Sequence, residues 1–329
     1  MKASPAADFE RLYTLGAGFQ ASEIIFTAVR LGIFTALDAG PATSKSLAGK
    51  LQLSQDALAR FMLALKSMGL IAERNGTYGK TALSRRCLGA AAGEDILIHL
   101  ETLKPSWANL SYSVKKGTMH APRKEALDDY PQQLKRFLGA MHASGLIKSA
   151  AIARAFPLQR YCRMLDIGGG MGTYAVAFAR ENLKLQATVF DLAAVVLHAK
   201  KYIRQCGIGR RVSVAEGECL SDPFPGNDYD LVLLSNILHI YAEGDARSII
   251  KKAAAALQSS GTLMIHDYII GSGDQFFVSL SDMTMLTGTP EGRCHGRDDL
   301  CRWMKAAGLS RIRTKAVNAG TSIIWGDRD

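Results

Sequence analysis

The stretch that decides the fold is "MLDIGGGMGTYAVAFAR", which runs from Met164 to Arg180. Its apolar beginning, which ends at Asp166, predicts a buried strand. The glycines that follow predict a turn built on backbone conformations open to glycine, and "TYAVAFAR" predicts a helix. In this order, the free N–H groups of the first helical turn face whatever binds at the corner. We therefore expect a nucleotide-like ligand there.

The chain after Arg160 repeats the alternation of strand and helix. Short strands are predicted at "CRMLDIG", "QATVFD", "RVSVAEG", "YDLVLLSN" and "GTLMIHDYII", with helices such as "AAVVLHAKKYIRQCG" and "DARSIIKKAAAALQSSG" between them. Such alternation predicts a parallel sheet covered by helices on both faces. The final runs, "RIRTKAV" and "TSIIWGD", flank Asn318-Ala319-Gly320 and predict an antiparallel hairpin. The predicted fold class is α/β, with a Rossmann-like sheet.

The N-terminal part follows a different pattern. Residues 8–38 have apolar positions at helical spacing, interrupted by glycines. Thr43 or Ser44 caps a short helix, and Ser54 caps a second one that Gly69 ends. A strand pair around Asn75-Gly76 follows. Helix, helix and hairpin in this order predict a winged helix. The predicted domains are residues 1–95, a helical part at 96–158, and a catalytic sheet domain at 159–329.

The bulk composition allows a nucleic-acid partner but does not require one. The net charge is +10, and residues 1–150 carry 19 Lys and Arg against 12 Asp and Glu. A recognition helix offers polar side chains to DNA, whereas the second predicted helix is dominated by apolar residues (Leu58, Phe61, Met62, Leu63, Leu65 and Met68). We expect a cytoplasmic protein with no membrane segment and no nucleic-acid partner. Six scattered cysteines lack paired metal spacing, so no metal site is expected.

The glycine turn alone does not identify the ligand. Gly170-Met-Gly172-Thr-Tyr-Ala175 satisfies the dinucleotide fingerprint, so a nicotinamide cofactor stays open. Three features favour S-adenosylmethionine. Asp166 ends the first strand, where a carboxylate could hold a cationic amino group. Asp191 ends the second strand, placed to accept from both ribose hydroxyls. Gly217-Glu218-Cys219-Leu220 ends the third strand and suits an adenine ring.

Together, "LDIGGGMG", "FDLAAVV", "EGECL…FP…YDLVLLSNILH" and "LGIFTALDAGPAT…LARFMLALKSMGLI" resemble the plant-type O-methyltransferase family, which includes caffeate and hydroxyindole O-methyltransferases and bacterial relatives. The resemblance spans nearly the whole chain. It implies an S-adenosylmethionine-dependent methyltransferase, with S-adenosylhomocysteine as product and a homodimer formed through the N-terminal domain. The implied cofactor residues are Asp166, Gly168, Gly170, Asp191, Leu192, Glu218, Cys219 and Ser235.

The catalytic pattern of the family is not kept. Aligning "HIYAEGDARSI" with the plant enzymes puts Asp245 where their basic histidine stands. In the plant enzymes two carboxylates orient this histidine. Asp267 falls where one of them is expected, and the stretch "GRCHG", which has no carboxylate, stands where the second is expected. An aspartate is a poor base for a phenol unless burial raises its pKa. The three candidate substitutes are His239, just past the fourth strand, His142 in "FLGAMHASG", and His295, which we expect in a surface loop.

The expected function is methyl transfer to a small molecule, most simply at a hydroxyl oxygen, with positioning dominant. Because the base differs, S- or N-methylation of a thioether, thiol or amine stays open, as does a homologue that binds the cofactor without transferring methyl. A winged-helix DNA-binding regulator is a remoter alternative. By resemblance, the acceptor would be walled by Trp107, Phe137, Met141, His142, Asn236, Met283, Met285 and Leu286.

Overall fold

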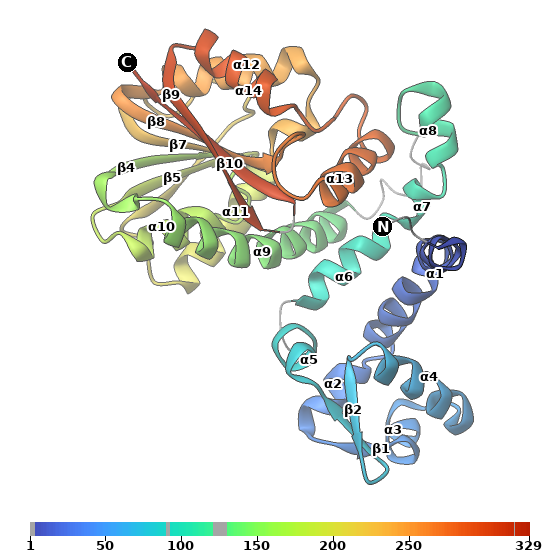
Figure 1. The fold of residues 1–329 in the computed structure, drawn as a ribbon. Helices are drawn as coiled ribbons and strands as arrows, with labels where there is room; N and C mark the ends of the chain where they lie inside the picture. The colour runs from blue at the N-terminus through green and yellow to red at the C-terminus, as the bar shows by residue number, and fades with distance from the viewer. Residues whose placement is uncertain (1–3, 90–92, 121–129, 319) are drawn as a thin grey trace. The chain divides into compact units, whose positions relative to one another are not determined.

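A computed structural model describes residues 4–89, 93–120, 130–318 and 320–329 (Figure 1). The chain divides into two compact units, Met1–Thr102 and Leu103–Asp329, and each is described by itself. The boundaries at residues 95 and 158 inferred from the sequence stay predictions.

The larger unit is built on a seven-stranded sheet in the order β6-β5-β4-β7-β8-β10-β9. Neighbouring strands from β6 to β8 run parallel, and β10 is antiparallel to both β8 and β9, so the Rossmann-like sheet with a closing hairpin is confirmed. Ala319, which the sequence analysis placed between the two final strands, lies outside the described residues. The strands are β4 (Arg163–Ile167), β5 (Gln186–Asp191), β6 (Val212–Glu216), β7 (Tyr229–Ser235), β8 (Leu257–Tyr268), β9 (Leu309–Asn318) and β10 (Thr321–Arg328).

Helices cover both faces of this sheet (Figure 1). Because side chains alternate along a strand, Leu165 and Ile167 of β4 enter one core and Met164 enters the other. The first core includes α12 (Glu243–Ala255) and α14 (Arg297–Ala306). The second includes α9 (Tyr130–Ala155), α10 (Thr173–Glu181) and α11 (Ala193–Gln205).

The remaining helices of this unit are short or peripheral. They are α7 (Lys104–Trp107), α8 (Leu110–Lys116), α13 (Gln275–Gly288) and the 3-10 turns η3 (Leu158–Arg160) and η4 (Leu238–Ile240). Helix α13 packs against α7 and α8.

One boundary differs from the sequence analysis. The apolar run "AAAALQSSG" continues the helical pattern of α12, yet the helix ends at Ala255 and β8 begins at Leu257. Leu257 pairs with Tyr229 of β7, and the N–H of Tyr229 donates to the carbonyl of Ala256. Tertiary pairing therefore overrides the local preference for helix.

The N-terminal unit contains α1 (Pro5–Arg30), α2 (Ile33–Ala36), η1 (Leu37–Ala39), β1 (Ala42–Thr43), α3 (Ser44–Leu51), α4 (Gln55–Ser67), β2 (Ile71–Arg74), β3 (Thr77–Lys80), α5 (Ala82–Cys87) and α6 (Gly93–Thr102). Thr43 and Ser54 cap α3 and α4 by accepting main-chain N–H groups, as expected. Asn75 and Gly76 take the left-handed conformations that a tight hairpin needs. The order helix, helix, hairpin is confirmed, and assignment to the winged-helix class stays a prediction.

Helix α1 runs unbroken through Gly16 and Gly18, and the break comes only at Gly32, whose φ is +67°. Large apolar side chains along its first half are exposed: Phe9, Leu12, Tyr13, Leu15 and Phe19. Among the described residues, no single helix has the length and apolar character to cross a membrane; only α1 taken with Ile33–Ala39, across a 51° bend, meets those two criteria. The cytoplasmic location stays a prediction.

Candidate active site

The turn after β4 needs glycine at several of its positions. A Cβ on Gly168, whose φ is +65°, would lie 2.1 Å from Cδ1 of Ile237, and one on Gly169 would lie 2.7 Å from Cγ of Asp166. Gly170 and Gly172 also have positive φ, and α10 starts directly after Gly172. The main chain at Gly168 and Gly169 therefore approaches Ile237, which follows β7, and Asp166 and Val189 too closely for a Cβ.

Asp166 lies beneath this turn and is fully buried. Neither carboxylate oxygen accepts a hydrogen bond of full geometry within the described ranges. Burial raises the pKa of Asp166 to about 7, and the main-chain N–H of Ala175 offsets only part of this rise. A buried carboxylate without a partner is costly unless a cation neutralises it. The methionine ammonium of S-adenosylmethionine is such a cation, so the residues present fit this cofactor.

Asp191 joins the end of β5 to the same turn. Its Oδ2 accepts the N–H of Gly170 at 2.8 Å, and its Oδ1 accepts the N–H of Leu192 at 2.8 Å. Burial raises the pKa of Asp191 above its ordinary value. A carboxylate has about four acceptor positions, so it retains capacity for the hydroxyls of a ribose. Leu192, half exposed, adds an apolar surface beside it.

The loop after β6 is held by its own side chains. Oε2 of Glu218 accepts the N–H groups of Leu220 and Ser221 at 2.9 and 2.8 Å. Burial raises the pKa of Glu218, but these hydrogen bonds outweigh it, so the pKa lies below its ordinary value. Cys219 is buried with its Sγ 3.1 Å from Oη of Tyr241. Glu218 and Cys219 thus shape the predicted adenine end as a fixed loop.

Ser235 and Asn236 stand at the carboxyl end of β7 and contact His266 of β8. Oγ of Ser235 lies 3.0 Å from Nδ1 of His266, and Asn236, at φ +53°, donates its N–H to the carbonyl of His266. Burial lowers the pKa of His266 to about 3, so its imidazole is neutral. Its Nε2 has no hydrogen-bond partner among the described side chains and main-chain groups. The sequence analysis missed His266, although it directly precedes Asp267.

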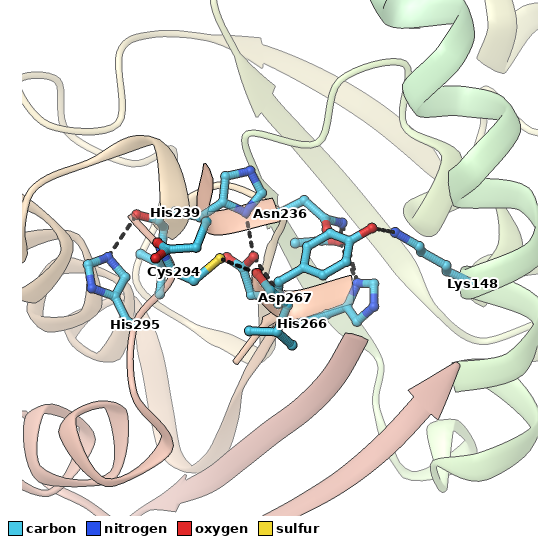
Figure 2. A network of polar contacts seen from close by, with 12 residues as sticks. Lys148, Asn236, His239, His266, Asp267, Cys294 and His295 are labelled. Atoms are coloured by element: carbon cyan, nitrogen blue, oxygen red, sulfur yellow. Dashed lines mark hydrogen bonds and ion pairs between the residues drawn. The ribbon is translucent and has the colours of Figure 1, made fainter. Parts of the chain in front are cut away.

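His239 and Asp267 form a pair at the same edge of the sheet (Figure 2). Nδ1 of His239, on η4, lies 2.5 Å from Oδ1 of Asp267, and both side chains are nearly buried. The same Oδ1 accepts the N–H of Tyr268 at 2.8 Å. Burial alone would raise the pKa of Asp267, but the electrostatic attraction and the hydrogen bond of His239 outweigh it and lower that pKa. The carboxylate is therefore ionised and fixes the orientation of the imidazole.

The other predicted catalytic candidates lie elsewhere. Asp245 is exposed in the first turn of α12. His142 packs against α10 and α11, with its Nδ1 2.7 Å from Oγ1 of Thr173 and its ring edge-on to Tyr202. The expectation for His295 was wrong: its side chain is buried, and Nε2 lies 3.0 Å from the carbonyl of Leu238. It supports the turn that carries His239.

Apart from Asn236, the predicted acceptor walls come from three helices of this unit. Trp107 on α7 is half-buried, Phe137 and Met141 on α9 are exposed, and Met283, Met285 and Leu286 lie on α13 and are partly exposed. A cleft of about 220 Å³ takes in part of this set; it is lined by Gly117, Asp282, Met283, Leu286, Thr289, Pro290, Glu291, Gly292 and Arg293.

Lys148 on α9 is a second residue that the sequence analysis missed. Its side chain is buried, and Nζ donates to Oη of Tyr268 at 3.4 Å (Figure 2). Burial lowers the pKa of Lys148 to about 8, against the attraction of Asp267. No motif identifies it, because a lysine in a helix is ordinarily on the surface.

Comparison with known proteins identifies the family of this chain. Residues 111–310 match the O-methyltransferase domain, and residues 13–90 match the O-methyltransferase dimerisation domain. The chain is 27% identical over 315 residues to a 3-hydroxy-5-methyl-1-naphthoate 3-O-methyltransferase of Streptomyces sahachiroi, covering 92% of this chain and 90% of that protein. It is 28% identical over 325 residues to the tetracenomycin polyketide synthesis 8-O-methyl transferase TcmO of Streptomyces glaucescens, covering 95% and 94%.

Among solved structures, human N-acetylserotonin methyltransferase in complex with S-adenosylmethionine superimposes with a TM-score of 0.87 at 22% identity, covering 100% of this chain and 99% of that one. The chain belongs to the O-methyltransferase family. It is an S-adenosylmethionine-dependent methyltransferase that acts on a hydroxyl group of a small molecule.

Proposed function

We propose that this enzyme methylates a hydroxyl on an aromatic small molecule, with His239 as the general base and Asp267 as the group that orients it. The observation that carries the proposal is the 2.5 Å pairing of Nδ1 of His239 with the buried carboxylate of Asp267. Two relatives are named for methylation of hydroxyls on a naphthoate and on a tetracenomycin polyketide, which favours an aromatic acceptor.

The pairing determines which nitrogen of His239 takes a proton. Nδ1 donates to Asp267, so the neutral imidazole leaves Nε2 as the acceptor, on the side of the ring away from Asp267 (Figure 2). A phenol has a pKa of about 10 and needs a base to ionise near neutrality. After proton transfer, the imidazolium that forms is stabilised by the buried Asp267 carboxylate. This arrangement supplies the base that the "HIYAEGDARSI" alignment had left open.

The cofactor supplies an electrophilic methyl group on a sulfonium. We assign its ammonium to Asp166, its main-chain contacts to Gly168 and Gly170, and its ribose to Asp191. Leu192, Glu218 and Cys219 would bound the adenine, and Ser235 would lie near the sulfonium. The acceptor would lie between the end of β7, where Asn236 stands, and the helices α9 and α13. Holding acceptor and methyl donor together contributes an effective molarity on the order of 10⁵–10⁸ M.

His239→Gln and Asp267→Asn test the base. Methyl transfer should be measured as S-adenosylhomocysteine formed with a panel of naphthols and hydroxynaphthoates. We expect His239→Gln to lower kcat by roughly 10²–10⁴-fold, the usual contribution of general-base catalysis. Cofactor affinity, measured by calorimetry, should stay unchanged because neither residue belongs to the glycine turn.

Asp245→Asn is the matched control at the aligned position and should keep full turnover. Full activity of His239→Gln, or loss only in Asp245→Asn, would refute this assignment.

We also propose that the enzyme is a homodimer formed through its N-terminal unit. Residues 13–90 match a dimerisation domain, and α1 exposes Phe9, Leu12 and Phe19 to about two thirds of their surface. Exposed apolar clusters of this kind mark protein interfaces. Sedimentation should give twice the 35.5 kDa of one chain, and Leu12→Asp combined with Phe19→Asp should shift it to the monomer. Leu183→Asp, at an exposed site in the other unit, is the control; a monomeric wild type contradicts the proposal.

A further inference from the structure

Lys148 lies between the cofactor turn and the His239–Asp267 pair. His142, Gly145 and Lys148 recur every three residues along α9, so they share one side of the helix. His142 hydrogen-bonds Thr173, and a Cβ on Gly145 would lie 3.2 Å from Cγ2 of Thr173. This side of α9 therefore packs on the start of α10, directly after the glycine turn. From there the Lys148 side chain reaches Tyr268 at the end of β8 (Figure 2).

The ammonium of Lys148 is poorly satisfied where it lies. It has three N–H donors, and within the described residues its hydrogen bond is to the Tyr268 hydroxyl at a long 3.4 Å, with Nζ also 4.9 Å from the centre of the Tyr268 ring. Asp267 attracts it, but the hydrogen bonds of that carboxylate, both at Oδ1, come from His239 and from the N–H of Tyr268 and not from Nζ. The remaining neighbour on β8, His266, is neutral. A buried ammonium without a full anionic partner is costly.

We propose that Lys148 binds an anionic oxygen on the acceptor, so that this enzyme selects aromatic hydroxyl compounds that also carry an acidic group such as a carboxylate. This rests on the proposed methylation of an aromatic hydroxyl. The ring centre of His239 lies 6.4 Å from that of Tyr268, and Nζ of Lys148 lies 4.9 Å from the same ring. Both groups thus flank the Tyr268 ring, and a flat acceptor lying along this ring would place its hydroxyl at His239 and its acidic group at Lys148. The two contacts would fix which hydroxyl faces the methyl group.

The test compares acids with their uncharged esters. The probes are 3-hydroxybenzoate and 6-hydroxy-2-naphthoate, and each acid is compared with its own methyl ester. The two acids differ in the separation between the hydroxyl and the carboxylate. Binding is measured by calorimetry on the full-length enzyme saturated with S-adenosylhomocysteine, so turnover is not required. For at least one pair, we expect the wild type to bind the acid about ten-fold or more tightly than the ester, and Lys148→Met to lose that preference. Lys148→Arg, which keeps the charge, should retain most of it.

Lys184→Met, at an exposed lysine in the same unit, is the matched control and should behave as wild type. S-adenosylhomocysteine binding should be unchanged in Lys148→Met, which shows that the variant is folded. The inference is overturned if the wild type binds ester and acid equally, if it binds neither acid at millimolar concentration, or if Lys148→Met keeps the preference. Failure of the proposed base would instead appear as full turnover in His239→Gln, whatever the acid preference.

Discussion

Oδ2 of Asp191 accepts the N–H of Gly170 at 2.8 Å, which ties the end of β5 to the glycine turn that follows β4. The other oxygen, Oδ1, accepts the N–H of Leu192 at the start of α11. The carboxylate thus fixes two main-chain segments at the corner where we place the ribose. Its role in binding and its role in holding the turn are coupled.

Asp191→Ala should weaken the binding of S-adenosylhomocysteine by roughly 1–3 kcal/mol, because two ribose hydroxyls and the Gly170 N–H lose a charged acceptor. Calorimetry on the two proteins measures the difference. Asp191→Asn, which keeps an acceptor of the same shape, should lose less than the alanine variant. Unchanged affinity in Asp191→Ala would remove this residue from the site.

Asp166 makes cofactor binding depend on pH. Burial raises its pKa to about 7, so the carboxyl is largely protonated in the free enzyme below that pH. A bound ammonium requires the ionised form, so binding below pH 7 must release a proton. The affinity for S-adenosylhomocysteine should therefore fall as pH decreases below 7, by up to ten-fold per unit. Calorimetry in buffers of different ionisation enthalpy counts the protons released.

Asp166→Asn is the control for this linkage. It should bind the cofactor more weakly at pH 8 and should not show the proton release that the wild type shows at pH 6. Equal proton release by both proteins would assign the titration to another group, and Asp191, whose pKa burial also raises, is the next candidate.

Much of the fold follows from local sequence rules. The structure contains the elements predicted from the glycine turn, from the strand–helix alternation and from the helix caps at Thr43 and Ser54. These predictions were correct because each feature depends on short-range backbone chemistry. The end of α12 was not predicted from the local sequence, because it is set by the pairing of Leu257 with Tyr229, a strand residue 28 positions earlier. The alternation of strands and helices also predicted a sheet covered on both faces, and the two cores on either side of β4 confirm it.

The candidate site was only partly predictable. Asp166 and Asp191 were found because strand ends of a parallel sheet meet at one edge. His239 was one of three candidate histidines, and only the folded chain shows that it meets Asp267. Lys148 could not be found, since its burial depends on α9 packing against α10 and β8. Nothing in the local sequence distinguishes it from a lysine on the surface.

Gly168→Ala should abolish cofactor binding. The added Cβ would lie 2.1 Å from Cδ1 of Ile237, and alanine at a φ of +65° adds backbone strain. Either the turn or Ile237 must shift, and Ile237 precedes the 3-10 turn that carries His239. Calorimetry with S-adenosylhomocysteine and circular dichroism together measure the effect. Gly209→Ala, with nothing within 4 Å and no positive φ, is the matched control and should bind normally; wild-type affinity in Gly168→Ala would contradict the close approach.

His266 should make the ligand-free enzyme less stable in acid. Burial lowers its pKa to about 3, whereas the unfolded side chain titrates near its ordinary value of 6.5. Between these values the unfolded chain binds the proton and the folded chain does not, so this group's contribution to stability is complete above pH 6.5 and is lost as pH falls. Asp166, with its raised pKa, acts in the opposite direction between its ordinary 3.8 and about 7.

His266→Gln removes only the contribution of His266 to this pH dependence and leaves that of Asp166. Relative to wild type, the slope of the unfolding free energy against pH between 4 and 6 should therefore fall by about 1.4 kcal/mol per unit. Urea unfolding at each pH measures it, and identical slopes in the two proteins would show that His266 is protonated in the folded state.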